Sequence, residues 1–396
     1  MRRILFVDDE PKVLEGLKRM LHGMRREWEM AFANGGMEAL EILNTKSFDV
    51  VISDMRMPGM DGYQLLEKVR QLHPEAVRII LSGYSDRELI LRSVRSAHQY
   101  LAKPCEAEMV KSTVARACAL RDLLKDDSLA KLISQIDSLP SLPTLYTKVI
   151  DELNSPSSSI QKIAEIIASD VGMTAKILQL ANSAFFGLSQ HVNSPLRAVT
   201  ILGLDTIKAL IMTVQIFSQF DRSTPSGFSI ADLWEHSMRC GVFAKTIAKA
   251  EAQERIAVED GFMGGLLHDV GKLVLVANLP ERYHEALTLA ADPSRTLWEA
   301  EQEVFGTTHA QVGAYLMGLW GLPDRIVEAI AFHHSPSECL DLSFSTLTAV
   351  HVADALEHDL TSGGDPRTDT RLNREYLGAL KVADRVPVWT AACEPL

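Results

Sequence analysis

The sequence predicts two domains: an α/β domain built on a doubly wound, five-stranded parallel sheet, followed by an all-α domain. Between residues 3 and 125, short apolar runs alternate with amphipathic segments. This pattern is typical of parallel strands covered by helices on both faces. Strand signals then disappear, and apolar residues recur with helical spacing. The length of 396 residues suits two or three domains.

Five apolar runs in the first domain are expected to form the strands. They are Ile4–Val7, Met30–Ala33, Phe48–Ser53, Val77–Ser82 and Gln99–Ala102, with helices between them at Pro11–Arg25 and Tyr63–Gln71. Polar residues stand at or just past the ends of four of these runs: Asp8, Asp9, Asp54, Ser82 and Lys103. Ligands of open parallel sheets bind at the carboxyl ends of the strands, so we expect these side chains to share one site.

The residue types at this edge of the sheet point to phosphoryl transfer. Clustered carboxylates repel one another and need a cation, and hard oxygen ligands suit Mg²⁺. Mg²⁺ neutralises phosphoryl oxygens while a carboxylate attacks phosphorus in line. A lysine adds a positive charge for the phosphate. The pattern therefore predicts an aspartate that accepts a phosphoryl group with the help of Mg²⁺.

The same residues stand in stretches that resemble a known family. Val7-Asp8-Asp9-Glu10, the run from Asp54 to Gly62, Ser82-Gly83-Tyr84 and Tyr100-Leu101-Ala102-Lys103-Pro104 resemble the receiver domain of two-component response regulators, which has a flavodoxin-like fold. The resemblance implies that Asp54 is the phosphoacceptor and that a sensor histidine kinase is the phosphodonor. It implies Mg²⁺ ligands at Asp8, Asp9, Asp54 and the backbone carbonyl of Arg56. It also implies switching and phosphate contacts by Ser82, Tyr100 and Lys103, and a cis Lys103–Pro104 bond. The alternative is a flavodoxin-like module that only dimerises.

A helical linker and an all-α domain are expected to follow. Glu106 to Lys131 has one helical pattern, and Pro140 and Pro143 then break it. Ser158 with Gln161 resembles a capping box that opens a helix Ile160–Ser169. Further helical patterns are Thr174–Ala181, Leu196–Ile201, Asp205–Phe217, Ala231–Ala250, Phe262–Leu275, His309–Leu319 and Asp324–Phe332. The expected boundaries are 1–122 for the receiver domain, 123–138 for the linker, 139–360 for the all-α output domain and 361–396 for a C-terminal extension.

Histidines and aspartates recur along the all-α domain in an order that favours a metal site. They are His236, His268, Asp269, His309, His333, His334 and Asp354. Imidazole and carboxylate groups bind Fe, Mn or Zn, and a carboxylate such as Asp269 can bridge two ions. A two-metal site could clamp a phosphate ester and activate a water. Asp232 is expected on the same helix face as His236. Without metal, these groups would form a buried polar network, and the sequence leaves both readings open.

This order, with Leu266-Leu267-His268-Asp269-Val270-Gly271-Lys272, resembles the HD superfamily of metal-dependent phosphohydrolases. Further stretches between Leu132 and Asp354, such as Leu139-Pro140-Ser141-Leu142-Pro143 and Trp234-Glu235-His236-Ser237, resemble its HDOD output branch. That branch is generally regarded as regulatory or scaffolding, without established hydrolase activity. The chain also departs from the cyclic-di-GMP phosphodiesterases of the superfamily, because Ser335-Pro336 follows His333-His334 where those enzymes have a glutamate and a Gly-Tyr-Pro segment.

The first hypothesis is therefore a cytoplasmic response regulator in which phosphorylation of Asp54 changes the contacts of a non-enzymatic output domain with a downstream signalling protein. The alternative is a phosphorylation-gated, metal-dependent phosphohydrolase acting on a nucleotide or cyclic dinucleotide, with Lys272 near the phosphate. The net charge of −12 argues against DNA and membranes as partners. The five scattered cysteines suit a reducing cytoplasm. A homodimer and a nucleotide ligand stay open.

Overall fold

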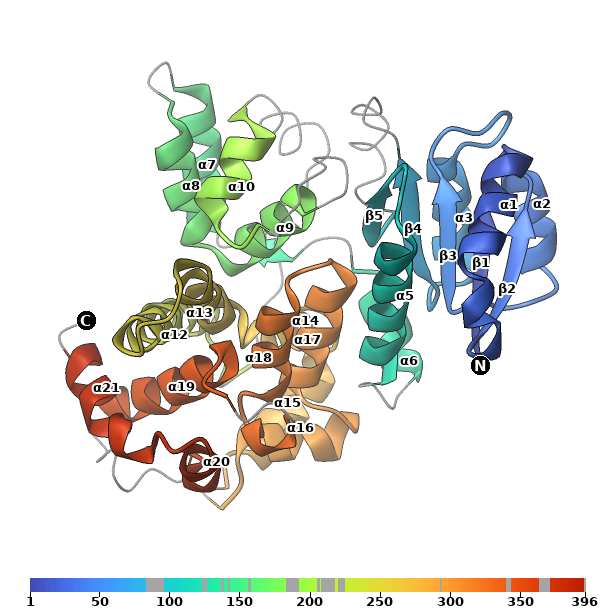
Figure 1. Cartoon of the computed structure of the whole chain (residues 1–396). Helices are drawn as coiled ribbons and strands as arrows, with labels where there is room; N and C mark the ends of the chain where they lie inside the picture. The colour runs from blue at the N-terminus through green and yellow to red at the C-terminus, as the bar shows by residue number, and fades with distance from the viewer. Residues whose placement is uncertain are drawn as a thin grey trace.

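The computed structural model confirms the predicted fold class: a parallel-sheet domain followed by a helical domain (Figure 1). It describes residues 1–82, 96–122, 127–136, 139–141, 143–155, 158–182, 192–204, 207, 218–219, 225–292, 294–339, 343–362 and 371–394. The expected helix Asp205–Phe217 lies almost entirely outside the described residues, as does the side chain of Ser82. The α/β domain occupies one end of the molecule, and the C-terminal helices occupy the other.

The sheet of the first domain has the strand order β2-β1-β3-β4-β5, with every neighbouring pair parallel. The strands are β1 (Arg2–Val7), β2 (Trp28–Ala33), β3 (Val50–Asp54), β4 (Val77–Ser82) and β5 (Gln99–Ala102). The helices of this domain are α1 (Pro11–Met20), α2 (Gly36–Leu43), α3 (Gly62–Leu72) and α5 (Ala107–Asp122). Because Val7 pairs with Ser53, the residues after β1 and at the end of β3 meet at one edge of the sheet.

Side chains alternate between the two faces of this sheet, and each face has its own core. Ile4, Phe6 and Ile52 pack on the side of α1 and α5, whereas Leu5 and Val51 pack on the side of α2 and α3. The α1–α5 core is continuous with apolar residues of the helical domain. The two domains therefore share buried apolar surface, which favours a defined arrangement between them.

Two helical patterns of the first domain and linker differ from their expected extents. The expected helix Pro11–Arg25 is α1 followed by a 3₁₀ turn, η1 (His22–Arg26), because the chain tightens after Leu21. The pattern Glu106–Lys131 is divided into α5 and α6 (Asp127–Ser134), with residues 123–126 outside the described part. The carbonyl of Ser134 at the end of α6 accepts a hydrogen bond (2.7 Å) from the buried Arg78 of β4. The linker helix is thus fastened to the sheet.

In the part of the second domain that the structure describes, the regular elements are helices apart from one short parallel pair, β6 (Pro140–Ser141) and β7 (Ser218–Gln219). Its first helices are α7 (Pro143–Asn154), α8 (Ile160–Ala168), α9 (Val171–Ala181) and α10 (Pro195–Leu202). Its central helices are α12 (Ile230–Ala250), α13 (Arg255–Leu267), α14 (Val270–Asn278), α15 (Pro280–Leu289), α16 (Leu297–Phe305), α17 (His309–Leu319) and α18 (Asp324–Phe332). Its last elements are η4 (Pro336–Glu338), α19 (Thr346–Ser362), α20 (Arg374–Ala379), η5 (Ala383–Arg385) and α21 (Val386–Cys393). Across the described residues, none of the helices is long and apolar enough to cross a membrane.

Two expectations for the helical domain are corrected. Ser159, not Ser158, caps α8, and its hydroxyl accepts from the backbone N–H of Lys162. The expected helix Phe262–Leu275 is interrupted, because α13 ends at Leu267 and α14 starts at Val270. His268 and Asp269 occupy the joint between these two helices. The apolar periodicity runs through the joint, so it gave no sign of the break.

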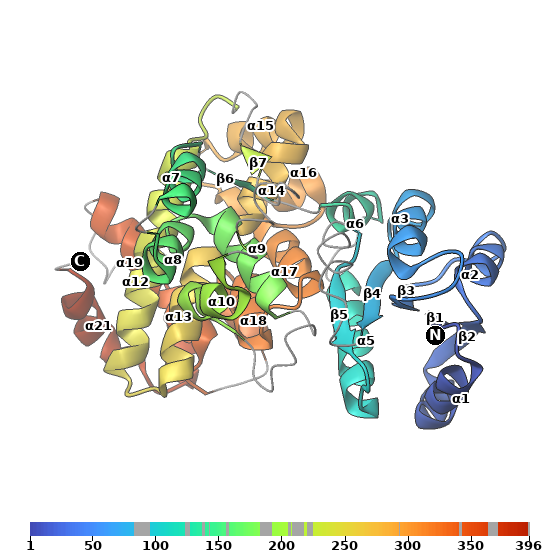
Figure 2. The ribbon, with the colours of Figure 1, turned by 90° about the horizontal axis from the view of Figure 1, so that it is seen from above.

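The domains meet where α5 and α6 pack against α17, with further contacts from β5 to α17 and from α5 to α18 (Figure 2). The side-chain amide of Gln99 in β5 donates to the carbonyl of Gly318 in α17 at 3.0 Å. Arg116 of α5 forms an ion pair with Asp324 at the start of α18, with Nε and Oδ1 3.0 Å apart. The receiver-like domain therefore touches the two helices near the turn that joins them.

Candidate functional site

The first candidate site lies at the carboxyl edge of the parallel sheet. Asp8 follows β1, Asp54 ends β3 and Lys103 follows β5. The Lys103 ammonium donates to Asp8 Oδ2 at 2.7 Å and also contacts Asp54 Oδ1. The backbone N–H of Glu10 donates to Asp8 Oδ1 at 2.9 Å, and that of Arg56 donates to Asp54 Oδ2 at 2.9 Å. Three strand ends thus hold two carboxylates and one ammonium in direct contact.

The electrostatics of this site follow from partial burial of opposite charges. Burial raises the pKa of Asp54, although the Lys103 ammonium acts in the other direction. Burial alone would lower the pKa of Lys103, but its contacts with Asp54 and Asp8 raise it. Lys103 therefore keeps its charge at neutral pH. The carboxylate oxygens of Asp8 and Asp54 are hard donors of the kind that suits Mg²⁺, so the residues fit that ion.

The remaining predicted residues of the first site are less tightly placed. Asp9 is half-buried beside Asp8, and the Arg56 side chain is exposed. Tyr100 is buried on the α2–α3 side of the sheet. Ser82 pairs with Ala102 across β4 and β5, which puts its backbone at the same edge. The Lys103–Pro104 peptide bond is cis, as the family resemblance implied.

The second candidate site lies where several segments of the helical domain converge. His236 comes from α12, His268 and Asp269 from the joint between α13 and α14, His309 from the start of α17, His333 and His334 from the end of α18, and Asp354 from α19. All seven predicted ligands gather here. Asp232 does not, because it is exposed in the first turn of α12, where its backbone N–H bonds to the cap Ser229.

Two buried carboxylates, Asp269 and Asp354, lie among the imidazoles. Asp269 Oδ1 is 3.1 Å from His309 Nε2, and its Oδ2 is 3.5 Å from the Nε2 atoms of both His236 and His268. Asp354 Oδ1 is 3.3 Å from His236 Nε2 and 3.6 Å from His268 Nε2. Both carboxylates therefore face the same two histidines, as a shared cation site requires.

Four of the histidines hold their Nδ1 atom against an acceptor. The Nδ1 acceptors are the Gly265 carbonyl for His268 (2.6 Å), the Ile330 carbonyl for His333 (2.9 Å), Glu301 for His309 (2.6 Å) and Glu357 for His236 (2.6 Å). A neutral imidazole that donates from Nδ1 has its lone pair on Nε2. Anchoring the ring in this way is characteristic of metal-binding histidines. In the neutral rings, the four Nε2 lone pairs would face the side of the two carboxylates.

The close approach of these Nε2 atoms tests whether the residues fit a metal. His236 Nε2 lies 3.1 Å from His268 Nε2, and His309 Nε2 lies 3.1 Å from His334 Nε2. Two facing lone pairs repel unless a proton or a metal cation lies between them. The buried Nε2 of His333 has no hydrogen-bond partner within the described part of the chain. Imidazoles and carboxylates in this arrangement fit Fe, Mn or Zn.

Burial and neighbouring charges set the ionisation of the two aspartates. Burial would raise the pKa of Asp269, but Lys272, whose Nζ donates to Oδ2 at 2.6 Å, and the nearby imidazoles hold it well below its usual range. Burial likewise opposes the lowered pKa of Asp354, which hydrogen bonds from His236 and His268 hold well below its usual range. Both carboxylates are ionised at neutral pH. Lys272, expected near a phosphate, is paired with Asp269.

The histidines divide into two groups by their pKa. Burial and the neighbouring imidazoles hold the pKa of His333 and of His334 well below the usual value, so both are neutral at pH 7. Burial opposes protonation of His309, but Glu301 raises its pKa to about 8. Burial also opposes protonation of His236, whose pKa is raised by Cys240, Asp354 and Glu357. Ligand histidines must be neutral, so metal binding at His309 and His236 would release protons.

Four neighbours of the site were not expected from the sequence. Cys240 and His358 lie one helical turn beyond His236 and Asp354, respectively, and each belongs to a group whose ligand atoms lie within 4.8 Å of one another. Glu357 stands three residues after Asp354, so helical spacing alone could have found it. Glu301 is fully buried on the apolar face of α16 with Ala300 and Phe305. An acidic residue inside an apolar stripe was the available signal.

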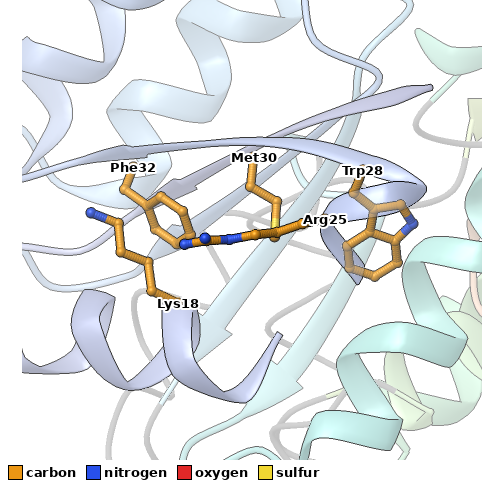
Figure 3. A pocket seen from close by; sticks show the side chains of 5 residues that line it. All are labelled: Lys18, Arg25, Trp28, Met30 and Phe32. Carbon is orange, nitrogen blue, oxygen red and sulfur yellow. The ribbon is translucent and has the colours of Figure 1, made fainter. Parts of the chain in front are cut away.

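A separate pocket lies beside the edge strand β2 (Figure 3). Its volume is about 520 Å³, and Lys18, Arg25, Trp28, Met30 and Phe32 line it. The Arg25 side chain extends between Met30 and Phe32, and the Lys18 ammonium lies 4.8 Å from the centre of the Phe32 ring. The cations are thus already placed against the apolar wall that a ligand would cover.

Comparisons with known proteins agree with the division of the chain. The family model of the response regulator receiver domain matches residues 4–115, and that of the HDOD domain matches residues 139–336. An uncharacterized protein of Treponema pallidum is 27% identical over 209 residues, covering 52% of this chain and 39% of that protein. The hydrogenase transcriptional regulatory protein HoxA of Bradyrhizobium diazoefficiens is 35% identical over 129 residues, covering 32% of this chain and 26% of HoxA. The chain thus spans well under half the length of these relatives.

Solved structures are also similar to part of the chain. The MmoQ response regulator of Methylococcus capsulatus is 23% identical, and the match covers 62% of this chain and 93% of that chain with a TM-score of 0.49. Half of the present chain matches the HDOD family, and a receiver domain precedes that half. The chain belongs to the response regulators in which a receiver domain is followed by an HDOD domain.

Proposed function

We propose that Asp54 accepts a phosphoryl group from a sensor histidine kinase, and that this modification controls the HDOD domain. The observation that carries the proposal is the meeting of Asp8, Asp54 and Lys103 at the carboxyl edge of the sheet. A carboxylate oxygen of Asp54 would bond to phosphorus as the bond between phosphorus and the kinase histidine breaks. Lys103 would stabilise the transferred charge. Mg²⁺ held by Asp8, Asp9, Asp54 and the Arg56 carbonyl would neutralise phosphoryl oxygens.

Intact-protein mass spectrometry tests this step directly. The purified chain is incubated with acetyl phosphate and Mg²⁺, and we expect a mass gain of one phosphoryl group. Asp54→Asn should abolish the gain. Asp61→Asn is a matched control, because Asp61 caps α3 nearby and asparagine caps a helix equally well. Labelling of Asp54→Asn to the extent of the wild type would contradict the assignment.

The same proposal includes a route from the receiver to the output domain. Gln99 and Arg116 contact α17 and α18 near the turn that joins them. The opposite ends of these helices carry His309 and the pair His333-His334. A helix rises about 1.5 Å per residue, so α17 carries a displacement at Gly318 over about 14 Å to His309. Phosphorylation adds charge beside Lys103, which directly follows β5, and would shift the contacts that β5 makes with α17.

Hydrogen exchange tests the route. We expect phosphorylation to change amide exchange in α17 and α18, and we expect no change in Asp54→Asn. Arg116→Ala removes the ion pair with Asp324 and should raise exchange at the start of α18 without phosphorylation. Arg255→Ala is the control, because its ion pair with Glu259 is exposed and remote from the receiver. Unchanged exchange in α17 and α18 after complete phosphorylation would refute the route.

The output itself is proposed to be binding of a downstream signalling protein. The family resemblance supports it, and the partner is not identified. Capture of a partner that depends on the state of Asp54 and survives in Asp269→Ala would support a scaffolding output. Loss of capture in Asp269→Ala, with the fold intact, would tie the output to the histidine site.

The histidine site favours a second candidate function, metal-dependent hydrolysis of a phosphate ester such as a nucleotide or cyclic dinucleotide. The observation in favour is the convergence of His236, His268, Asp269, His309, His333, His334 and Asp354. Bound metal would polarise a phosphoryl oxygen and activate water. Elemental mass spectrometry of untagged protein, purified without oxygen or chelators, should find Fe, Mn or Zn that Asp269→Ala loses. Hydrolysis that is also lost in Asp269→Ala would support the enzyme, and absence of metal above background would exclude it.

A further inference from the structure

Two buried carboxylates stand behind the histidine site, and neither proposal above uses them. Glu301 comes from α16 and Glu357 from α19. Each carboxylate accepts a hydrogen bond from the Nδ1 atom of one histidine, on the side of the ring away from the site. Both are buried, although glutamate is almost never fully buried unless it is paired. The burial of these two carboxylates therefore needs a physical explanation.

Glu301 is committed to His309. Its Oε2 accepts from the backbone N–H of His309 at 2.7 Å and from the Nδ1–H at 2.6 Å. The side chain is fully buried, and its Oε1 has no hydrogen-bond partner among the described residues. A buried carboxylate is costly unless positive charge lies close to it. Across the described chain, no lysine or arginine forms an ion pair with Glu301, so the charge that balances it is expected on or beyond the His309 ring, where the Lys272 ammonium also acts on it.

Glu357, on α19, holds the ring of His236 in the same way. Its Oε2 lies 2.6 Å from His236 Nδ1, and its Oε1 lies 2.7 Å from Arg239 Nη2. Glu357 follows Asp354 by three residues, so one turn of α19 supplies both a candidate ligand and the support of another ligand. Arg239 holds the carboxylate in turn, which limits the rotation of the Glu357 side chain.

The need for the Glu301 carboxylate follows from where His309 lies on its helix. His268 and His333 stand at helix ends, and each donates to the carbonyl three residues earlier, so the preceding turn fixes the ring. His309 is the first residue of α17, and no preceding helical turn offers it a carbonyl. Its ring has to be fixed by another element, and Glu301 on α16 is the residue that does so.

We propose that Glu301 and Glu357 are positioning residues of a metal centre, which hold His309 and His236 with Nδ1 protonated and Nε2 directed at the ion. The inference rests on the proposed metal site and identifies the residues that would hold two of its ligands in place. Carboxylates in this place also increase the basicity of the ligand nitrogen, and loss of such a partner typically weakens metal binding by 10- to 100-fold.

Titration of the metal-free full chain with Co²⁺ tests the inference, because the visible absorption of Co²⁺ reports the number and geometry of its nitrogen ligands. We expect Glu301→Ala and Glu357→Ala to weaken Co²⁺ binding toward 100-fold and to change the spectrum, and the glutamine variants to weaken binding by about 10-fold. The glutamine variants keep an acceptor oxygen without the charge, so they remain informative where an alanine variant does not fold. Glu303→Ala is the control, because Glu303 lies on the exposed side of α16 and pairs with Arg295.

The outcomes separate the two levels of the argument. Wild-type protein that binds no Co²⁺ overturns the metal site and the inference with it. Wild-type protein that binds Co²⁺ while both glutamine variants bind it within about twofold and with the same spectrum overturns the positioning role alone. Weaker binding with an altered spectrum in the Glu301 and Glu357 variants, and wild-type behaviour in Glu303→Ala, supports the proposal.

Discussion

Gly271 is the position where one added methyl group should damage the helical domain most. A Cβ at this residue would lie 1.9 Å from the carbonyl oxygen of His309 and 2.8 Å from the backbone nitrogen of Gly313. Real Cβ atoms essentially never come closer than 3.0 Å to such atoms, so α14 and α17 would have to separate by about 1 Å. Both contacts are with backbone, which cannot turn aside as a side chain can. Overpacking of this kind costs about 3 kcal/mol.

Thermal unfolding followed by circular dichroism checks the prediction with two matched glycines. Gly16 in α1 and Gly378 in α20 have nothing within 4 Å of an added Cβ. Alanine there should stabilise the chain by about 0.5–1 kcal/mol, because glycine is the poorer helix former. We expect Gly271→Ala to lower the melting temperature and the other two to maintain or raise it. Because the His309 carbonyl is displaced, Gly271→Ala should also weaken Co²⁺ binding. A Gly271→Ala protein as stable as the wild type would refute the packing of α14 on α17 described above.

Three further predictions concern single charges. Lys103→Met removes the ammonium from between Asp8 and Asp54 and should slow phosphorylation by acetyl phosphate by about 100-fold, measured from the rate of mass gain; an unchanged rate would contradict its role. Asp354→Asn removes a candidate ligand and should reduce Co²⁺ affinity by more than the 10- to 100-fold typical of supporting residues, whereas equal affinity would exclude Asp354 from the site. Burial, with the nearby charge of Arg78, holds the pKa of His98 well below the usual 6.5, so the folded chain takes up fewer protons there than the unfolded chain. Because of His98, the free energy of unfolding falls by up to about 1.4 kcal/mol per pH unit below pH 6.5, and above that pH His98 no longer changes it. His98→Gln should flatten the decline in the urea midpoint between pH 6.5 and 5, and a slope equal to that of the wild type would contradict this reasoning.

Elements bounded by strong local signals could be predicted to the residue. The strands Val77–Ser82 and Gln99–Ala102 match their expected extents, as do the helices His309–Leu319 and Asp324–Phe332. Thr308 caps the first of these helices with a complete capping box, and Pro323 precedes the second. In each case the residues that stop or start the element are its own neighbours. The neighbouring residues were therefore sufficient to predict the bounds of these elements.

The joint at His268-Asp269 shows where local chemistry is insufficient. Phe262–Leu275 has unbroken apolar periodicity, so sequence reasoning extends one helix across it. The structure divides the helix there, and Gly271, just beyond the joint, packs against the His309 backbone. The break is set by a contact between residues 38 positions apart, counted from 271 to 309. No window along the chain contains both partners.

The burial of Glu301 also depends on tertiary structure. On α16 alone it is one acidic residue among several, and its place in the apolar stripe does not identify the histidine that it contacts. The structure buries it because the backbone N–H and the ring of His309 both require an acceptor at that point. The candidate ligands could be predicted from the sequence, since imidazole and carboxylate residues recur in a recognisable order. The two proposed positioning residues, Glu301 and Glu357, have only weak local signals, and only the assembled helices show which histidine each carboxylate contacts.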